Sequence, residues 1–489
     1  ERKSSVSGFC APRPVGFCRA ETYQRLKRRL DVLHEHHIAR TLTSEEQHRR
    51  MLQTPVPKLV LSLAAPTVAS QLISIIYNTA DTYFVSQIST SASAAVGVVF
   101  SLSSIIQAYG FGVAMGTSSL ISLRLGEKKD RDANGYASSG FFAELVGGLL
   151  MLIFGLLFLE PLMRVLGATE TMLPHACAYG RIILMGAPIM CCSFVLNCVL
   201  RAEGAAVVSM VGLCAGGLIN IALDPLFIFT FEMGTAGAAI ATVASQCVSL
   251  MILSISFLRG RSIVHLHPKY VSCHMRDYGQ IIAVGFPTIA RQGMASLASA
   301  LMNIQGAIYG DAAVAALTIS NKIYLLVRNV MIGIGQGFQP VAGYNYGAGD
   351  RKRTREAFLF ATKLGTVICI LAAGIIAAFA GSIIAWFRDD EQVVAIGRVA
   401  LLYACAVMPF MAYSTFVNQL YQCLGFKLPA TVLASLRQGI CFLPLIFILP
   451  HFLGLAGVQA TQPASDLLTF IICIPFQITF FRKHLRDNV

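Results

Sequence analysis

Pro66-Thr67-Val68-Ala69-Ser70-Gln71 returns 221 residues later in the chain as Pro287-Thr288-Ile289-Ala290-Arg291-Gln292. The same offset joins further glycine, proline and asparagine pairs: Gly112 and Gly333, Gly116 and Gly337, Gly126 and Gly347, Pro188 and Pro409, Asn197 and Asn418, and Gly204 and Gly425. Self-similarity at a fixed offset indicates that one large unit occurs twice. Two repeated bundles with a central cleft are typical of secondary transporters. The cleft between the halves is therefore where we expect function.

The composition is that of a membrane protein. Of the 489 residues, 55% are hydrophobic and only 13% are charged. Long stretches such as residues 145–159 and 366–380 contain no charged side chain. A soluble fold cannot hide so much apolar surface. We therefore expect helices that cross a lipid bilayer.

Twelve apolar segments are long enough to cross the roughly 30 Å of hydrocarbon, which takes about 17 to 25 helical residues. They begin near residues 59, 93, 136, 175, 206, 234, 279, 312, 356, 393, 428 and 453. Six fall in each half, so both copies enter the membrane from the same side. The sequence predicts an all-α polytopic membrane protein of twelve transmembrane helices, in two six-helix lobes related by a pseudo-two-fold axis along the membrane normal.

This count predicts five parts: a basic cytoplasmic arm (1–56), an N-lobe with spans one to six (57–258), a cytoplasmic linker (259–278), a C-lobe with spans seven to twelve (279–482) and a cytoplasmic tail (483–489). The first methionine is Met51, and the preceding residues have no apolar core like that of a signal peptide. We expect residues 1–50 to be an upstream leader, with the working protein beginning near Met51. The alternative is a native arm in which residues 25–40 form a basic surface helix.

Basic residues mark one side of the membrane. They follow the even-numbered spans: Arg124, Lys128, Lys129, Arg131, Arg201, Arg259, Arg261, Lys269, Arg276, Arg351, Lys352, Arg353, Arg355, Lys427, Arg482, Lys483 and Arg486. The opposite loops hold little more than Arg164 and Arg388. The positive-inside rule then places both termini in the cytoplasm, in a multi-pass protein of the plasma (cytoplasmic or inner) membrane. Topology and contact with anionic lipid account for the net charge of +13 without a nucleic-acid partner.

Polar groups at membrane depth are the candidate functional residues, because burying them there is costly. Asp81 lies late in span one and Asp224 in the middle of span five. Asn220 precedes Asp224 by four residues and shares its helix face. Thr242 in span six adds a hydroxyl, and Pro225 leaves the carbonyl four residues before it without a donor. These oxygens suit Na⁺, or a proton held on a carboxylate. The alternative is that each aspartate caps a broken helix or pairs with a basic residue.

The repeat shows that this acidic pair occurs once. The aligned positions in the second half are uncharged. Met302 corresponds to Asp81 at the offset of 221, and, when Pro225 is matched to Pro444, Gly439 corresponds to Asn220 and Leu443 to Asp224. The second half instead carries four basic residues in or near its spans: Arg291, Lys322, Arg328 and Arg437. Residues needed for architecture should recur in both copies, whereas a coupling site needs to be present once. We expect Lys322 and Arg328 to snorkel or to pair across the cleft.

Over residues 57–482 the chain resembles the multidrug and toxic compound extrusion (MATE) transporters, and within them the prokaryotic branch of DNA-damage-inducible and staphylococcal multidrug exporters. The residues that carry the resemblance are Pro66 and Asp81 in span one, Tyr179 and Asn197 in span four, Asn220, Asp224 and Pro225 in span five, and Ala238 and Thr242 in span six. In that family such residues form a cation-binding network in the amino-terminal lobe, and binding is linked to bending of span one at its proline. Another branch has its acidic site in the carboxy-terminal lobe, and here spans seven and eight lack an acidic group at depth.

The resemblance implies a monomeric antiporter that works by alternating access, with Na⁺ or H⁺ as the coupling ion and no other cofactor. The implied substrates are small organic compounds, cationic and amphipathic. A lipid-linked oligosaccharide flippase of the same superfamily is the alternative, although it favours a strongly basic cleft and more than twelve spans. An intramembrane enzyme would need a paired acid and base or a metal cluster, and no histidine lies in mid-span.

Overall fold

Helices make up the fold of residues 44–88 and 90–485, the parts of the chain that the computed structural model describes. The first half contains α2 (Ser44–Gln53), α3 (Val56–Ser86), α4 (Thr90–Gly126), α5 (Asp130–Leu157), α6 (Leu159–Val165), α7 (Leu173–Ala202), α8 (Ala206–Pro225), the π-helical turn η1 (Leu226–Thr230) and α9 (Gly234–Leu258). The second half contains η2 (Pro268–Tyr270), α10 (Met275–Ala307), α11 (Asp311–Gly347), α12 (Arg351–Ala378), α13 (Ala380–Phe387), α14 (Glu391–Cys423), α15 (Lys427–Ser435), the π-helical turn η3 (Leu436–Ile440), α16 (Phe442–Leu453) and α17 (Leu455–His484). These two ranges contain no β-strand, so the predicted all-α class is confirmed.

Ten segments in the described part of the chain are long and apolar enough to cross a membrane. The two predicted spans outside that set are α10 and α11, which are 33 and 37 residues long. Polar side chains such as Arg291, Gln292 and Arg328 make these two helices less apolar, and all three line a cavity rather than face lipid. With α10 and α11, the described helices supply the twelve predicted spans.

The two copies of the repeat make reciprocal contacts with each other. A Cβ atom on Gly126 would lie 2.1 Å from the carbonyl oxygen of Tyr344, and one on Gly347 would lie 2.2 Å from that of Leu123. Leu123 and Tyr344 are themselves related by the offset of 221 residues. Contacts that are equivalent in both directions are the signature of a two-fold relation. The predicted pseudo-symmetry of the two lobes is therefore present, and only glycine permits this close backbone approach.

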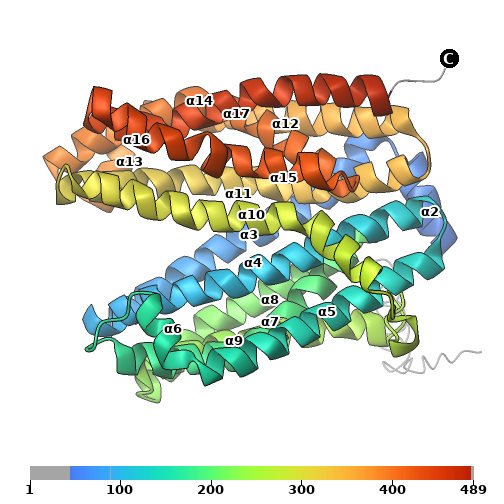
Figure 1. Cartoon of the computed structure of the whole chain (residues 1–489), viewed down its shortest axis with the longest axis horizontal. Coiled ribbons are helices and arrows are strands. Elements are labelled where there is room, and N and C mark those ends of the chain that lie inside the picture. The colour runs from blue at the N-terminus through green and yellow to red at the C-terminus, as the bar shows by residue number, and fades with distance from the viewer. Residues whose placement is uncertain (1–43, 89, 486–489) are drawn as a thin grey trace, which may run out of the picture. The chain divides into compact units, whose positions relative to one another are not determined.

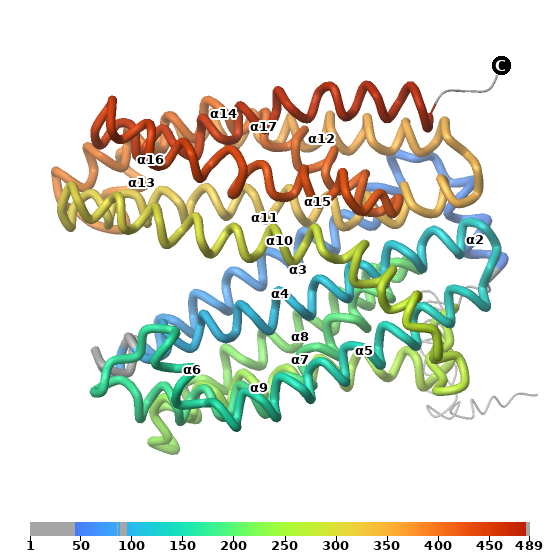
Figure 2. The backbone as a smooth tube through the Cα atoms, in the orientation of Figure 1, coloured from blue at the N-terminus to red at the C-terminus, as the bar shows by residue number. Residues whose placement is uncertain are grey.

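The lobes meet at one end and separate toward the other (Figure 1). The N-lobe comprises α3–α9 and the C-lobe comprises α10–α17. The smooth trace in Figure 2 shows that they approach at the end where α2 and the last turn of α17 lie, and diverge toward α6 and α13. Crossing contacts of α3 with α11 and of α4 with α10 join the lobes.

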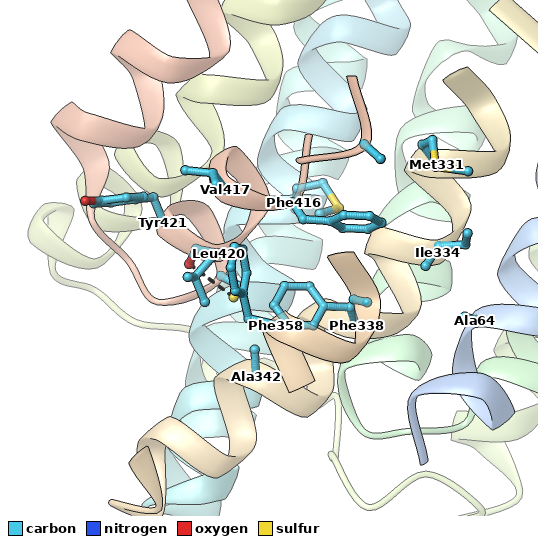
Figure 3. Packing of buried hydrophobic residues seen from close by; sticks show 14 of the residues in the cluster. Ala64, Met331, Ile334, Phe338, Ala342, Phe358, Phe416, Val417, Leu420 and Tyr421 are labelled. Carbon is cyan, nitrogen blue, oxygen red and sulfur yellow. Dashed lines mark hydrogen bonds between the residues drawn. The ribbon is translucent and has the colours of Figure 1, made fainter. Parts of the chain in front are cut away.

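The C-lobe is packed around aromatic side chains from three helices. Phe338 of α11 meets Phe358 of α12 with ring centroids 6.4 Å apart, and meets Phe416 of α14 at 6.3 Å. Both pairs are edge-on, the arrangement that the ring quadrupoles favour. Figure 3 shows these rings between the helices, with Leu420 near Phe358. The same buried apolar cluster continues into N-lobe residues such as Leu59 and Val113.

The short helix α2 contacts both lobes at their closed end. Gln47 donates from Nε2 to the carbonyl oxygen of Glu203 in the N-lobe at 2.6 Å. The Nδ1 atom of His48 lies 2.8 Å from the hydroxyl oxygen of Tyr344 in the C-lobe. Residues 44–50 therefore belong to the same folded unit as the lobes, and the start of the working protein near Met51 stays a prediction. The remaining residues of the predicted arm, 1–43, lie outside the described part, as does the alternative basic helix over residues 25–40.

The predicted inter-lobe linker is anchored on Glu203, which follows the last turn of α7. One carboxylate oxygen of Glu203 accepts hydrogen bonds from the Ser262 hydroxyl at 2.7 Å and from the amides of Ile263 and Val264 at 3.0 and 3.2 Å. The side chain is buried, and this burial raises the pKa of Glu203 to about 7. The linker is thus held against the N-lobe by an acidic group that titrates near neutral pH.

Candidate functional site

A cavity of about 260 Å³ lies between the two lobes. Its N-lobe wall includes five predicted site residues: Asp81, Tyr179, Asn197, Asn220 and Thr242. Its C-lobe wall is polar and basic: Thr288, Arg291, Gln292, Arg328, Asn329, Gln336, Gln339, Gln419 and Gln422. Of the charged side chains that line the cavity, Asp81 and Arg201 come from the N-lobe, and Arg291 and Arg328 come from the C-lobe.

Asp224 is the most deeply placed of the predicted residues, with no exposed surface. Its Oδ1 atom accepts a hydrogen bond from the Nδ2 atom of Asn220 at 3.1 Å. Its Oδ2 atom is enclosed and has no hydrogen-bond partner among the described residues. A buried carboxylate oxygen without a donor is costly, because it has lost water and gained nothing in return. The arrangement leaves this oxygen available for a cation or a proton.

Asp81 approaches the same place from α3. Its Oδ1 atom is also enclosed, and it too lacks a hydrogen-bond partner within the described ranges. The charge on Asp81 acts on Asp224, and both carboxylates act on Tyr179. The structure thus brings the two predicted aspartates and Tyr179 into one electrostatic cluster. Within the described residues neither aspartate forms an ion pair with a basic residue, which was one part of the alternative; that each aspartate caps a broken helix stays open.

Thr242 and Ala238 lie together on α9. The Thr242 hydroxyl donates to the carbonyl oxygen of Ala238 at 3.0 Å, and Thr242 lines the cavity. An ion here would meet carboxylate, amide and hydroxyl oxygens, which are ligands of hard cations. Across the described residues, no three His, Cys, Asp or Glu side chains gather as metal ligands. The donor set fits Na⁺ better than a transition metal.

Both predicted prolines lie inside helices. Pro225 ends the regular part of α8, and the chain continues as the π-helical turn η1. Proline removes a backbone donor, and π-helical turns are frequent at functional sites. Pro66 is buried in α3 next to Thr67, whose hydroxyl donates to the carbonyl oxygen of Gly333 in the C-lobe at 2.7 Å. The predicted hinge therefore lies at a contact between the lobes.

Asn197 has a structural contact that its role in the predicted network did not anticipate. Its Nδ2 atom donates to the carbonyl oxygen of Ser209 at 3.1 Å and so joins α7 to α8. Asn418, its repeat partner, donates to the carbonyl oxygen of Ala430 at 2.8 Å. A contact made in both lobes serves the architecture of the repeat, as the pairing of these asparagines in the sequence indicated.

Asp466 is a buried acidic residue of the C-lobe that our sequence analysis missed. It lies in α17, where its Oδ1 atom accepts from Arg437 Nε at 2.6 Å and from Gln462 Nε2 at 3.1 Å. Its other oxygen accepts from the hydroxyl of Tyr324. Sequence reasoning examined spans seven and eight for acidic groups, whereas Asp466 is in span twelve. The available signal was Arg437, which needs a partner at that depth.

Glu144 of α5 was missed as well. It is completely buried in the N-lobe, and both carboxylate oxygens lack a hydrogen-bond partner among the described residues. It is absent from the wall of the cavity between the lobes. A single acidic residue within an otherwise apolar span was a signal that the sequence offered. Asp81, Glu144, Asp224 and Asp466 are thus acidic side chains in the interior of predicted spans, and Asp81 and Asp224 belong to the predicted site.

Comparison with known proteins agrees with this architecture. The MatE family model matches residues 66–226 and again residues 287–448, one match in each lobe. The multidrug export protein MepA of Staphylococcus aureus strain N315 is 26% identical over 419 residues, which cover 85% of this chain and 92% of that protein.

Solved structures agree as well. A MATE transporter crystallised with MaL6 superposes with a TM-score of 0.84 at 26% identity, over 89% of this chain and 99% of that one. The outward-facing conformation of a multidrug resistance MATE family transporter superposes with a TM-score of 0.84 at 26% identity, over 89% and 98% of the two chains. A family match in both lobes leaves one conclusion about identity: the chain belongs to the MatE family and is a multi-pass membrane transporter rather than an enzyme.

Proposed function

We propose that this chain is a secondary active multidrug efflux transporter that exchanges Na⁺ or H⁺ for an amphipathic organic compound. The observation that carries the proposal is the pair Asp81 and Asp224, each with an enclosed oxygen that lacks a donor, beside a cavity shared by both lobes. The name of the staphylococcal relative supports multidrug export, and the complex of the MATE transporter with MaL6 supports a ligand-binding cavity.

The proposed cycle uses the N-lobe site as the coupling element. A single Na⁺ or H⁺ entering between Asp81 and Asp224 offsets one of the two negative charges and so weakens the repulsion between the carboxylates, which lets α3 and α8 approach. Bending of α3 at Pro66 would accompany this approach and reduce the N-lobe part of the cavity. Organic substrate is then released, and the lobes rock about their glycine contacts to expose the cavity on the other side.

The basic loops support an orientation in which the closed end, with α2 and α17, faces the cytoplasm. In this orientation the open end of the cavity faces the exterior. We propose a plasma-membrane location, cytoplasmic termini, a monomeric transporter surrounded by anionic lipid, and small cationic amphipathic substrates. No further cofactor is part of the proposal.

Uptake into proteoliposomes tests the function directly. A fluorescent amphipathic cation is offered to vesicles under a Na⁺ gradient, a proton gradient or neither. Antiport predicts that the dye accumulates against its own concentration gradient when one of the two ion gradients is present. Without an ion gradient, the dye should not accumulate. Equal flux in all three conditions overturns antiport. Movement of a labelled polyprenyl-linked sugar between leaflets, without accumulation of the dye, would instead favour the flippase.

A further inference from the structure

Two arginines of the C-lobe project into the cavity without a protein partner. Arg291 of α10 and Arg328 of α11 both line it, and Arg328 is only 7% exposed. The Nε atom of Arg291 is enclosed and has no hydrogen-bond partner in the described part of the chain. Among those same residues, Arg328 forms neither a hydrogen bond nor an ion pair. Arg328 is buried and Arg291 is half-buried, and buried guanidinium groups are ordinarily paired, so both are able to bind an anion that enters the cavity.

The nearest acidic group is already occupied. Asp466 accepts hydrogen bonds from Arg437, Tyr324 and Gln462, and its ion pair with Arg437 has an N···O distance of 2.6 Å. Arg328 is within electrostatic reach of Asp466 but makes no contact with it. Arg291 is within electrostatic reach of both Arg328 and Arg437. Three guanidinium groups therefore share one carboxylate, which leaves an excess of two positive charges beside the cavity.

The repeat shows that the fold does not require these charges. At the offset of 221 residues, Arg291 corresponds to Ser70 and Arg328 to Gln107. Ser70 and Gln107 occupy the wall of the same cavity on the N-lobe side, where uncharged side chains suffice. The second copy thus carries cations at positions where the first copy is neutral. Its charges have a purpose other than architecture.

We propose that Arg291 and Arg328 bind the anionic group of the transported compound, a carboxylate or a phosphate. Guanidinium groups match the planar, two-oxygen edge of such groups and form charge-assisted hydrogen bonds with them. Neighbouring amides of Gln292 and Asn329 line the same wall and supply further donors. Asp81 on the N-lobe wall receives the cationic part of the same molecule. This assignment rests on the proposed transport function and extends its substrates from cations to zwitterions and organic acids.

Equilibrium binding to the purified full chain tests this site with two dyes that differ in one charge. One is a rhodamine with a free carboxylate, and the other is its methyl ester; fluorescence anisotropy reports the affinity of each. Arg291→Gln and Arg328→Gln should each weaken binding of the free acid by about 10- to 100-fold, the value of a charge-assisted hydrogen bond. Binding of the ester should change less than about twofold, which also shows that the variants are folded. Lys322→Gln, an exposed cation on α11 outside the cavity wall, is the matched control and should alter neither affinity.

Equal losses for acid and ester, or no loss for the acid, would overturn the anion site. Arg328→Lys should restore part of the acid affinity if charge is the cause. Competition separates the two sources of the anion. If short-chain phosphatidylglycerol displaces the acid dye and phosphatidylcholine does not, the site binds a lipid phosphate. If the acid dye stays bound in the presence of phosphatidylglycerol, the site binds a soluble organic acid. Binding is measured without an ion gradient, so a negative result in the antiport assay does not change the binding result. Conversely, a negative result for the anion site does not affect antiport of the ester.

Discussion

The hydroxyl of Thr67 in the N-lobe donates a hydrogen bond to the carbonyl oxygen of Gly333 in the C-lobe, with an O···O distance of 2.7 Å. The repeat partner of Thr67 is Thr288, which accepts from Gln422 Nε2 within its own lobe at 2.7 Å. The backbone repeats in the two lobes, but the Thr67 contact crosses between the lobes whereas the Thr288 contact stays within one lobe. The residue directly after the predicted hinge Pro66 is one that holds the lobes together.

Replacing Thr67 with valine should loosen the closed end of the cavity. The change keeps the side-chain shape and removes one hydrogen bond, worth about 0.5–1.5 kcal/mol, so the balance between conformations shifts by up to about tenfold. Hydrogen exchange of amides in residues 123–128 and 344–349 should become faster. Thr288→Val is the control, because its bond lies within one lobe. Unchanged exchange in the Thr67 variant would show that this bond does not hold the lobes closed.

Pro66→Ala should impair turnover more than folding. Alanine restores a backbone donor and straightens the place where α3 would bend toward α8. Transport in proteoliposomes should fall at least about tenfold, with normal membrane levels. Pro287→Ala, the same change in the C-lobe, should matter less. Equal losses from both substitutions would mean that the hinge is shared by both lobes.

Asp224→Asn should abolish ion-coupled export and leave the protein folded. The amide keeps the volume but cannot exchange a proton and binds Na⁺ less strongly. It also removes a buried carboxylate with an unsatisfied oxygen, so the melting temperature should stay equal or rise. Asp81→Asn should give a milder or substrate-dependent defect. Export by Asp224→Asn at a near-normal rate under both ion gradients would refute the coupling site.

Asp466→Asn should have the opposite effect on stability. This carboxylate accepts from Arg437, Tyr324 and Gln462, so its loss leaves the half-buried Arg437 guanidinium without its anionic partner. Breaking such a pair costs about 3–5 kcal/mol. The melting temperature in detergent should fall clearly, in contrast to Asp224→Asn. Similar melting temperatures for the two variants would contradict the different environments of the two acids.

Glu203 should make stability depend on pH. Burial raises its pKa to about 7 in the folded state, from about 4.5 in an unfolded chain. The folded protein therefore binds more protons, and stability should decrease as pH rises from about 4.5 to 7, then level off. The melting temperature of Glu203→Gln minus that of the parent should therefore become more positive as the pH rises from about 4.5 to 7. A difference that is constant between pH 5 and 8 would exclude Glu203 as the cause.

Sequence alone determined the class, the twelve spans, the internal repeat and the acidic residues of the candidate site. These features are local or periodic: an apolar run of sufficient length must be a helix in lipid, and Asn220 must share a face with Asp224 four residues later. The reciprocal approach of Gly126 and Gly347 also follows once glycines recur at a fixed offset.

Only the tertiary structure decided which buried charges have partners. Asp466 and Arg437 are 29 residues apart on different helices, and no periodicity reveals that they meet. Arg291 and Arg328 look equivalent to Arg437 in the sequence, yet they line the cavity without a partner while Arg437 forms an ion pair. The helix register sets the face on which a side chain lies, whereas the packing of distant helices sets what it contacts. Packing brings equivalent positions of the two lobes to one shared cavity. Charges that differ between the two copies of the repeat therefore face each other there.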